Sequence, residues 1–137
     1  DGRKMSKSYG NVIPLLESEK NLKKSIMKIV TNSLEPGEPK ESNDCNIFEL
    51  YKYFATESEI QSMQQFYDDG ISWGEAKEIL FNSVNQELQP IRSKYEELSK
   101  NKDHINDLLS DGAKKARLIA KEKILEIREA VGLSKIL

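Results

Sequence analysis

Apolar residues recur at intervals of three and four over the longest regular stretch of the sequence, residues 72–98. They are Ala76, Leu80, Val84, Leu88, Ile91, Tyr95 and Leu98. This period gathers apolar side chains on one face of an α-helix, and no segment alternates apolar and polar residues long enough to indicate a strand. Pro90 lies inside the stretch, but the period continues across it, so we expect one kinked helix. The sequence therefore predicts an all-α fold, a helical bundle.

Three short patterns mark the starts of helices, because Ser, Thr or Asn three residues before Glu can form a capping box. They are Asn46-x-x-Glu49, Thr56-x-x-Glu59 and Ser72-x-x-Glu75. The third opens the long helix described above. The apolar positions predicted for the other two helices are Ile47, Leu50, Tyr51 and Phe54, then Ile60, Met63 and Phe66. Gly70 is a natural end for the second of these helices.

An earlier helix is expected from Ser18, as its N-cap, to Asn32. Its buried face would consist of Leu22, Ile26, Ile29 and Val30. Residues 33–43 are predicted to form a loop, because they contain Pro36, Gly37 and Pro39, and neither proline nor glycine suits a helix interior.

The C-terminal third is predicted to hold a short helix around residues 105–109, a break at Asp111-Gly112 and a last helix to Val131, with Gly132 as its stop. The positions expected to face inward are Ala113, Ala116, Ala120, Ile124, Ile127 and Val131. Small alanines would allow close helix packing there.

Several classes of protein are disfavoured by residues that are scarce or missing. The 137 residues include one cysteine, Cys45, and one histidine, His104, which leaves no internal disulfide and no Cys/His zinc cluster. No apolar run reaches the roughly 20 residues of a spanning helix, and no signal-peptide pattern opens the chain. We therefore expect a protein of the cytoplasm that neither spans a membrane nor is secreted, and we assign no metal ligand.

Charge is segregated along the chain, although the net charge is only -2. Residues 1–40 hold 8 basic and 5 acidic side chains, residues 41–100 hold 5 and 12, and residues 101–137 hold 8 and 6. A polyanion would meet the basic ends. The candidate nucleic-acid contacts are Arg92, Lys94, Lys114, Arg117, Lys121 and Arg128. The alternative is a solvated basic helix face, and the aromatic residues Tyr51, Tyr53, Tyr67 and Trp73 fit a core better than a base-stacking surface.

Residues 1–17 lack an apolar face and are predicted to form a loop and an extended entry. Within them, Lys4 and Lys7 are interleaved with the hydroxyls of Ser6 and Ser8. Ammonium groups, hydroxyls and backbone amides in this spacing can surround a phosphate chain. A solvated basic turn is the other interpretation of such a short pattern.

The pentapeptide Lys4-Met5-Ser6-Lys7-Ser8 equals the KMSKS signature of class I aminoacyl-tRNA synthetases, and its surroundings resemble the bacterial tryptophanyl-tRNA synthetase family. The similar segments are Asp1-Gly2-Arg3, Tyr9-Gly10-Asn11, Ile13-Pro14-Leu15, Ile26 to Thr31, Leu88-Gln89-Pro90-Ile91 before Tyr95, Asp111-Gly112-Ala113 and Gly132-Leu133. The resemblance covers essentially the whole chain.

The resemblance implies an ATP-binding KMSKS loop at residues 1–17 and an α-helical C-terminal domain for the tRNA anticodon at residues 18–137. The family activates tryptophan with ATP and transfers it to its cognate tRNA. By this resemblance Lys4 and Lys7 are catalytic, and Met5, Ser6 and Ser8 join them in nucleotide binding. Mg²⁺ would accompany the phosphates without a ligand from this segment.

The resemblance also implies that the nucleotide-binding sheet, the HIGH-type motif and the tryptophan pocket lie upstream. We therefore expect this chain to be a fragment of a longer ligase and to be inactive alone, and we expect the complete enzyme to be a homodimer. Two rivals remain open: the equivalent part of a tyrosyl-tRNA synthetase, and a stand-alone helical domain that binds RNA or protein.

Overall fold

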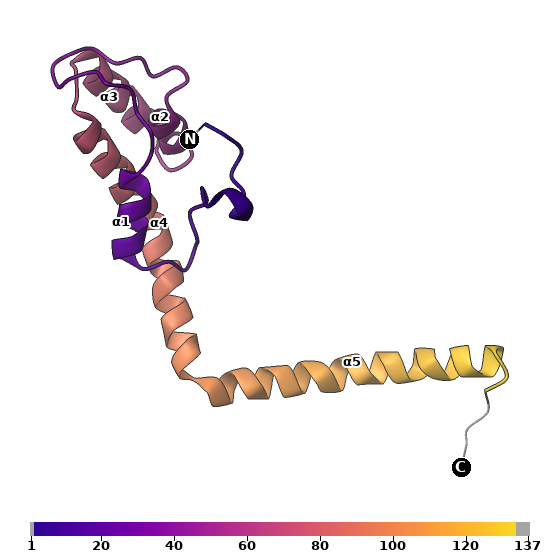
Figure 1. Ribbon diagram of the computed structural model, residues 1–137. Coiled ribbons are helices and arrows are strands. Elements are labelled where there is room, and N and C mark those ends of the chain that lie inside the picture. The colour runs from indigo at the N-terminus through magenta and orange to yellow at the C-terminus, as the bar shows by residue number, and fades with distance from the viewer. Residues whose placement is uncertain (1, 134–137) are drawn as a thin grey trace. The chain divides into compact units, whose positions relative to one another are not determined.

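The computed structural model describes residues 2–133, and this range contains helices and no strand, which confirms the all-α prediction (Figure 1). The elements are a short 3₁₀ turn η1 (Lys7–Tyr9) and the helices α1 (Glu19–Met27), α2 (Asn46–Tyr51), α3 (Glu57–Asp68), α4 (Trp73–Lys100) and α5 (Lys102–Ala130). Asp1, where the resemblance begins, lies outside the described residues. So do residues 134–137, the end of the expected helical domain. The chain forms two compact units, the first ending at Tyr95 and the second beginning at Glu96.

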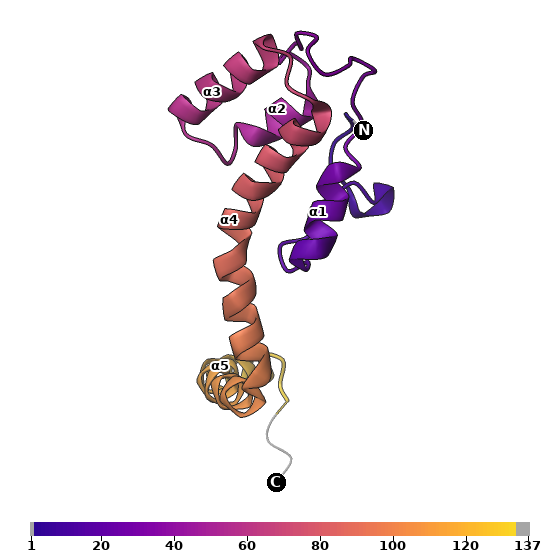
Figure 2. The same ribbon diagram turned by 90° about the vertical axis from the view of Figure 1, so that its left-hand side faces the viewer.

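The core of the first unit lies where α1, α2 and α3 pack against α4, and Figure 2 shows α1 running beside α4. Its buried side chains are Leu22 and Ile26 of α1, Ile47, Phe48 and Tyr51 of α2, Met63 and Tyr67 of α3, and Ala76, Leu80, Phe81, Val84 and Leu88 of α4. Half of the apolar positions that the helical period predicts for these four helices are among them. Removing so many apolar side chains from water is what holds the short helices in place.

Two of the three predicted capping boxes are present. The backbone N–H of Thr56 donates to the Glu59 carboxylate at 2.7 Å, and the Glu75 N–H donates to the Ser72 hydroxyl at 3.1 Å. The third prediction is wrong, because Cys45 is the N-cap of α2 and Asn46 is already helical.

Helix α1 begins as predicted, with the Ser18 side chain accepting from the Asn21 N–H at 3.3 Å, but it ends at Met27 rather than Asn32. The residues that follow, Ile29-Val30-Thr31, are all β-branched, and such residues lose side-chain freedom in a helix. The ammonium of Lys77 donates to the Met27 carbonyl at 3.2 Å and so satisfies one of the last carbonyls of α1. Burial lowers the pKa of Lys77.

The predicted loop between α1 and α2 folds back over the junction of α3 and α4. The amide of Gly37 donates to the Gly70 carbonyl at 2.8 Å, and the buried Lys40 donates from its ammonium to the carbonyls of Glu35 and Glu38 at 3.0 and 2.9 Å. The same ammonium lies 5.4 Å from the centre of the Trp73 ring. A lysine can be buried here because carbonyl oxygens and an aromatic face replace its water.

Tyr67 lies at the centre of the core and is fully buried. Its ring meets the rings of Phe48 and Trp73 edge to face, with centroids 5.3 and 5.8 Å away, and its hydroxyl lies 3.4 Å from the Cys45 sulfur. Burial raises the pKa of Tyr67 strongly. The core therefore contains Tyr51 and Tyr67, and Cys45 packs against it, whereas Tyr53 is exposed.

Helix α4 continues through Pro90, as the unbroken period predicts. Its buried face is shorter than predicted, since Ile91, Tyr95 and Leu98 are exposed. Phe66 and Val30, also predicted as inward positions, are exposed as well.

Helix α5 passes through Asp111-Gly112 without interruption, so the predicted break is wrong. A glycine inside a helix costs only about 1 kcal/mol, which a long helix can absorb, and Asp111 forms an ion pair with Lys115 at 2.8 Å one turn later. The expected burial of its apolar face is also wrong. Ala113 is half-buried, and Ala116, Ala120, Ile124, Ile127 and Val131 are exposed, because no other element among residues 96–133 covers this helix.

Candidate functional site

The residues of the KMSKS motif form a turn that reverses the chain. An extended segment leads to Ser6, the N-cap of η1, and the amide of Tyr9 donates back to the Ser6 carbonyl at 3.1 Å. Gly10 follows with φ of +63°, a left-handed conformation that few residues other than glycine adopt readily, and its amide donates to the Lys7 carbonyl at 3.2 Å. The predicted loop at the start of the chain is therefore an ordered reverse turn.

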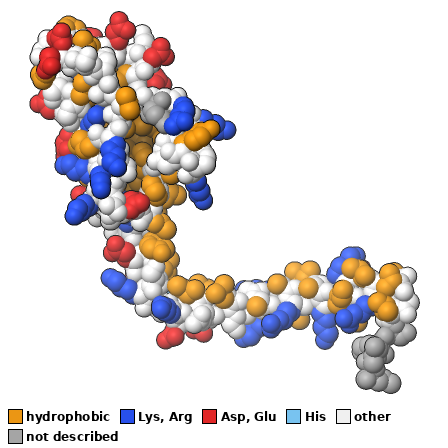
Figure 3. All heavy atoms as spheres, in the orientation of Figure 1, with side chains coloured by type: hydrophobic (Ala, Val, Ile, Leu, Met, Phe, Trp, Pro, Cys, Tyr) orange, Lys and Arg blue, Asp and Glu red, His pale blue; other side chains and the backbone are white. Residues whose placement is uncertain are grey.

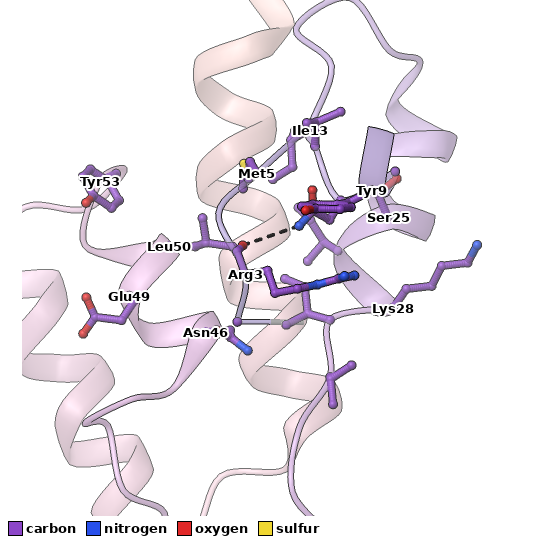
Figure 4. Close-up of a pocket in the computed structure, with 17 residues that line it drawn as sticks. Arg3, Met5, Tyr9, Ile13, Ser25, Lys28, Asn46, Glu49, Leu50 and Tyr53 are labelled. Carbon is purple, nitrogen blue, oxygen red and sulfur yellow. Dashed lines mark hydrogen bonds between the residues drawn. The ribbon is translucent and has the colours of Figure 1, made fainter. Parts of the chain in front are cut away.

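The side chain of Asn11 joins the segments before and after this turn. Its Oδ1 accepts from the Ser6 N–H at 2.8 Å, and its Nδ2 donates to the carbonyls of Lys4 and Arg3 at 3.4 and 3.5 Å. The bond to Arg3 is the dashed line in Figure 4. The sequence alone did not single out Asn11 as a functional residue, since it has no charge and no motif of its own outside the resemblance.

A pocket of about 500 Å³ lies behind the loop, between it and helices α1 and α2 (Figure 4). The loop contributes Met5 and Tyr9 to the lining, the helices contribute residues such as Ile26 and Leu50, and Lys28 joins them from the C-cap of α1. Lys4, Ser6, Lys7 and Ser8 do not line this pocket. Met5 and Tyr9 of the loop thus line the pocket, whereas the polar motif residues lie outside it.

The polar face presents a concentrated set of hydrogen-bond donors. Lys4 and Lys7 are exposed, and neither forms an ion pair with any residue between 2 and 133. The hydroxyls of Ser6 and Ser8 lie 2.8 Å apart and bond to each other, so whichever one accepts keeps its own proton for an outside acceptor. Two ammonium groups and a free hydroxyl proton fit an anion with several oxygens, such as a phosphate chain.

Arg3 is placed by a contact that sequence reasoning missed. Its guanidinium lies 4.5 Å from the centre of the Tyr9 ring, and both residues line the pocket. A cation over an aromatic face is stabilised by the ring quadrupole, so this pair ties the beginning of the loop to its 3₁₀ turn.

The candidate nucleic-acid residues fall into two groups. Lys114, Arg117, Lys121 and Arg128 are exposed on α5, where Figure 3 shows basic side chains along the helix. Because each residue turns an α-helix by about 100°, these four lie within an arc of about 60°. None of them pairs with an acidic side chain among the described residues, whereas Lys115 and Lys123 on other faces pair with Asp111 and Glu126.

The other two candidates, Arg92 and Lys94, follow Pro90 on α4. Lys94 is exposed. Arg92 is buried, its Nη2 donates to the Asn85 side-chain oxygen, and its Nη1 has no hydrogen-bond partner among the described residues. The structure therefore does not present the Arg92 guanidinium at the surface.

No group of three or more His, Cys, Asp or Glu residues within the described range is arranged to hold a metal ion. In the same range no helix combines the length and the apolar character that crossing a bilayer requires.

Comparison with known proteins gives consistent matches. Residues 1–89 match the family model described as tRNA synthetases class I (W and Y). A tryptophan–tRNA ligase of Neisseria meningitidis is 48% identical over 133 residues, and one of Pseudomonas aeruginosa is 47% identical over 133 residues. Each match covers 97% of this chain, but only 40% and 30% of those two proteins.

A solved structure has the same fold as this chain. The tryptophanyl-tRNA synthetase of Campylobacter jejuni, crystallised with ADP and tryptophan, is 44% identical and superimposes with a TM-score of 0.91. The match covers 97% of this chain and 42% of the crystallised one. The chain thus spans less than half the length of the relatives it matches.

Proposed function

Since the chain belongs to the class I tRNA synthetases of the tryptophan and tyrosine group, we propose that it is the C-terminal part of a tryptophan–tRNA ligase. The observation that carries the proposal is the KMSKS loop itself, whose two lysines are exposed and form no ion pair within the described chain. The names of the similar proteins favour tryptophan over tyrosine as the amino acid.

In this proposal Lys4 and Lys7 act on the phosphates of ATP. When the tryptophan carboxylate attacks the α-phosphorus, negative charge moves onto the departing pyrophosphate. Ammonium groups directed at the β and γ oxygens stabilise that transition state more than the ground state, which is what accelerates the step. Both side chains are exposed on the same loop, and Lys7 lies within the 3₁₀ turn.

The remaining motif residues support the two lysines. Ser6 and Ser8 supply hydroxyl donors, and Met5 anchors the loop by packing into the pocket beside α1 and α2. Mg²⁺ bound to the phosphates would neutralise further charge, and this segment supplies no evident ligand for it. Tryptophan would be held by the larger part of the enzyme that these 137 residues do not include.

The helices would contact the tRNA, and we propose α5 for this role. Its basic face has four cations in one arc without acidic partners, which is the arrangement that binds phosphates. The enzyme would act in the cytoplasm as a homodimer.

A hybrid enzyme tests the proposal. This chain replaces the matching segment of the Neisseria tryptophan–tRNA ligase, and the hybrid is assayed for tryptophan-dependent exchange of pyrophosphate into ATP and for charging of tRNA. Both activities should be retained with tryptophan and be absent with tyrosine. An inactive, folded hybrid would show that this chain does not supply the loop function, and the 137 residues assayed alone should give no exchange.

A further inference from the structure

We propose that Asn11 is a positioning residue of the signature loop, which fixes the spacing of Lys4 and Lys7 through their backbone. The inference rests on the proposed function of that loop. It starts from the observation that one amide side chain bonds to three peptide groups on the opposite side of the turn.

The three contacts fall on Arg3, Lys4 and Ser6, so they hold the segment that leads from Lys4 into the turn containing Lys7. The short bond, 2.8 Å from the Ser6 N–H to Asn11 Oδ1, lies between Lys4 and Lys7 in the sequence, and one of the two longer bonds ends on the carbonyl of Lys4 itself. Ser6 is also the N-cap of η1, the turn that contains Lys7. Holding both Lys4 and Ser6 by one side chain therefore restrains the backbone between the two Cα atoms that carry the ammonium groups.

Asparagine suits this position because its short side chain carries an acceptor and two donors together. Aspartate would keep the acceptor for the Ser6 N–H but would lose the donors toward Arg3 and Lys4. Leucine has nearly the shape of asparagine and would lose all three bonds. The two substitutions thus separate shape from hydrogen bonding.

The loop lies outside the core of the first unit, so its loss of order should leave the fold intact. None of the residues from Gly2 to Asn11 belongs to the buried core. Ser6 and Asn11 are half-buried, which protects their hydrogen bond from competition with water. Two lysines on a looser loop would still bind phosphate, but they would less often occupy the geometry of the transition state.

The first measurement uses the full chain. In Asn11→Leu the amide of Ser6 should exchange with solvent faster than in the parent, while the melting midpoint followed by tryptophan fluorescence should not change. The matched control is Asn43→Leu, because Asn43 is exposed and its side chain forms no hydrogen bond with any described residue.

The second measurement uses the hybrid ligase described above. Asn11→Leu should lower the rate of adenylate formation at saturating ATP by roughly 10 to 100 fold, the scale of a misplaced catalytic group, without changing KM for tryptophan. Asn11→Asp, which keeps the Ser6 bond, should recover part of that loss. In a Lys7→Ala background Asn11→Leu should cost much less, because the group it positions is gone.

The outcomes separate the two proposals. A hybrid that is inactive with the parent chain overturns the proposed function and, with it, this inference. An active hybrid that tolerates Asn11→Leu overturns the inference alone. If Asn11→Leu lowers the rate of adenylate formation by the same factor with Lys7 present and with Lys7→Ala, then Asn11 does not act through Lys7. That result would also overturn the inference.

Discussion

The backbones of Gly37 and Gly70 touch. The Gly37 N–H donates to the Gly70 carbonyl at 2.8 Å, and a Cβ built on Gly70 would lie 2.5 Å from the carbonyl carbon of Gly37. Gly70 also has φ of +83°, where side chains are rarely found. This contact fastens the loop between α1 and α2 to the turn between α3 and α4, and it requires glycine at position 70.

Gly70→Ala should therefore destabilise the first unit. Left-handed strain and a backbone clash together suggest a loss of about 2 to 4 kcal/mol in the free energy of unfolding. Denaturant unfolding followed by Trp73 fluorescence measures it. Gly112→Ala is the control, since a Cβ there meets nothing within 4 Å. Equal stability of Gly70→Ala and the parent would mean that the loop is not held at this point.

Acid should weaken the two capping boxes. Hydrogen bonds from Thr56 hold the pKa of Glu59 below its usual range, and bonds from Ser72 do the same for Glu75. A carboxylate whose pKa is lower in the folded state stabilises the fold above its unfolded pKa, and this stabilisation is lost as pH falls through the folded pKa. Urea midpoints measured from neutral pH to pH 3 should fall less steeply in Glu59→Gln and Glu75→Gln. Parallel curves for variant and parent would contradict the prediction.

Lys7→Ala in the hybrid ligase should slow adenylate formation by about 100 fold or more, the scale of removing one preorganised donor to a developing charge. Pre-steady-state formation of the adenylate measures it, and tryptophan affinity should be unchanged. Lys20→Ala removes an exposed charge of the same sign from α1 and should have no effect. Weaker tryptophan binding with an intact chemical step would assign Lys7 another role.

The basic face of α5 can be tested by the salt dependence of tRNA binding. Replacing Lys114, Arg117 and Arg128 with alanine in the hybrid should weaken binding, and each lost phosphate contact should reduce the slope of log K against log salt by about 0.7 to 0.9. Adenylate formation should not change. The double variant Lys115→Ala and Lys123→Ala removes cations from other faces and should alter the slope less. If the two sets behave alike, binding depends on total charge and not on this face.

Several features set by neighbours in the sequence were predicted, whereas features set by distant contacts were not. The local predictions that failed are the cap at Asn46 and the break at Asp111-Gly112. The capping boxes at Thr56 and Ser72 need only residues three positions apart, and the core faces of α1 to α4 follow from helical period. The apolar period continues past Met27 and predicts a longer α1, but the three β-branched residues Ile29-Val30-Thr31 disfavour a helix there. The contact of Gly37 with Gly70 joins positions far apart in the chain and leaves no local pattern.

The residues of the candidate site also divide into those that adjacent residues in the sequence predict and those that depend on how the chain folds. The KMSKS motif singles out Lys4 and Lys7 as candidates because its residues are adjacent, and both side chains are exposed. The amide of Asn11 was missed, since its importance depends on how the chain returns after Gly10. Arg92 looked like a surface cation in the sequence, but its surroundings bury it.

Helix α5 contributes no buried residue, so we do not expect its 29 residues to unfold cooperatively with the first unit. An isolated helix frays gradually from its ends, whereas a packed core is lost in one cooperative transition. The single tryptophan, Trp73, belongs to the first unit and packs against its core, so fluorescence reports that unit alone. Far-ultraviolet ellipticity reports the helices of both units together. The two melting curves should therefore not superimpose, and a midpoint fitted to the ellipticity of the whole chain would describe neither unit.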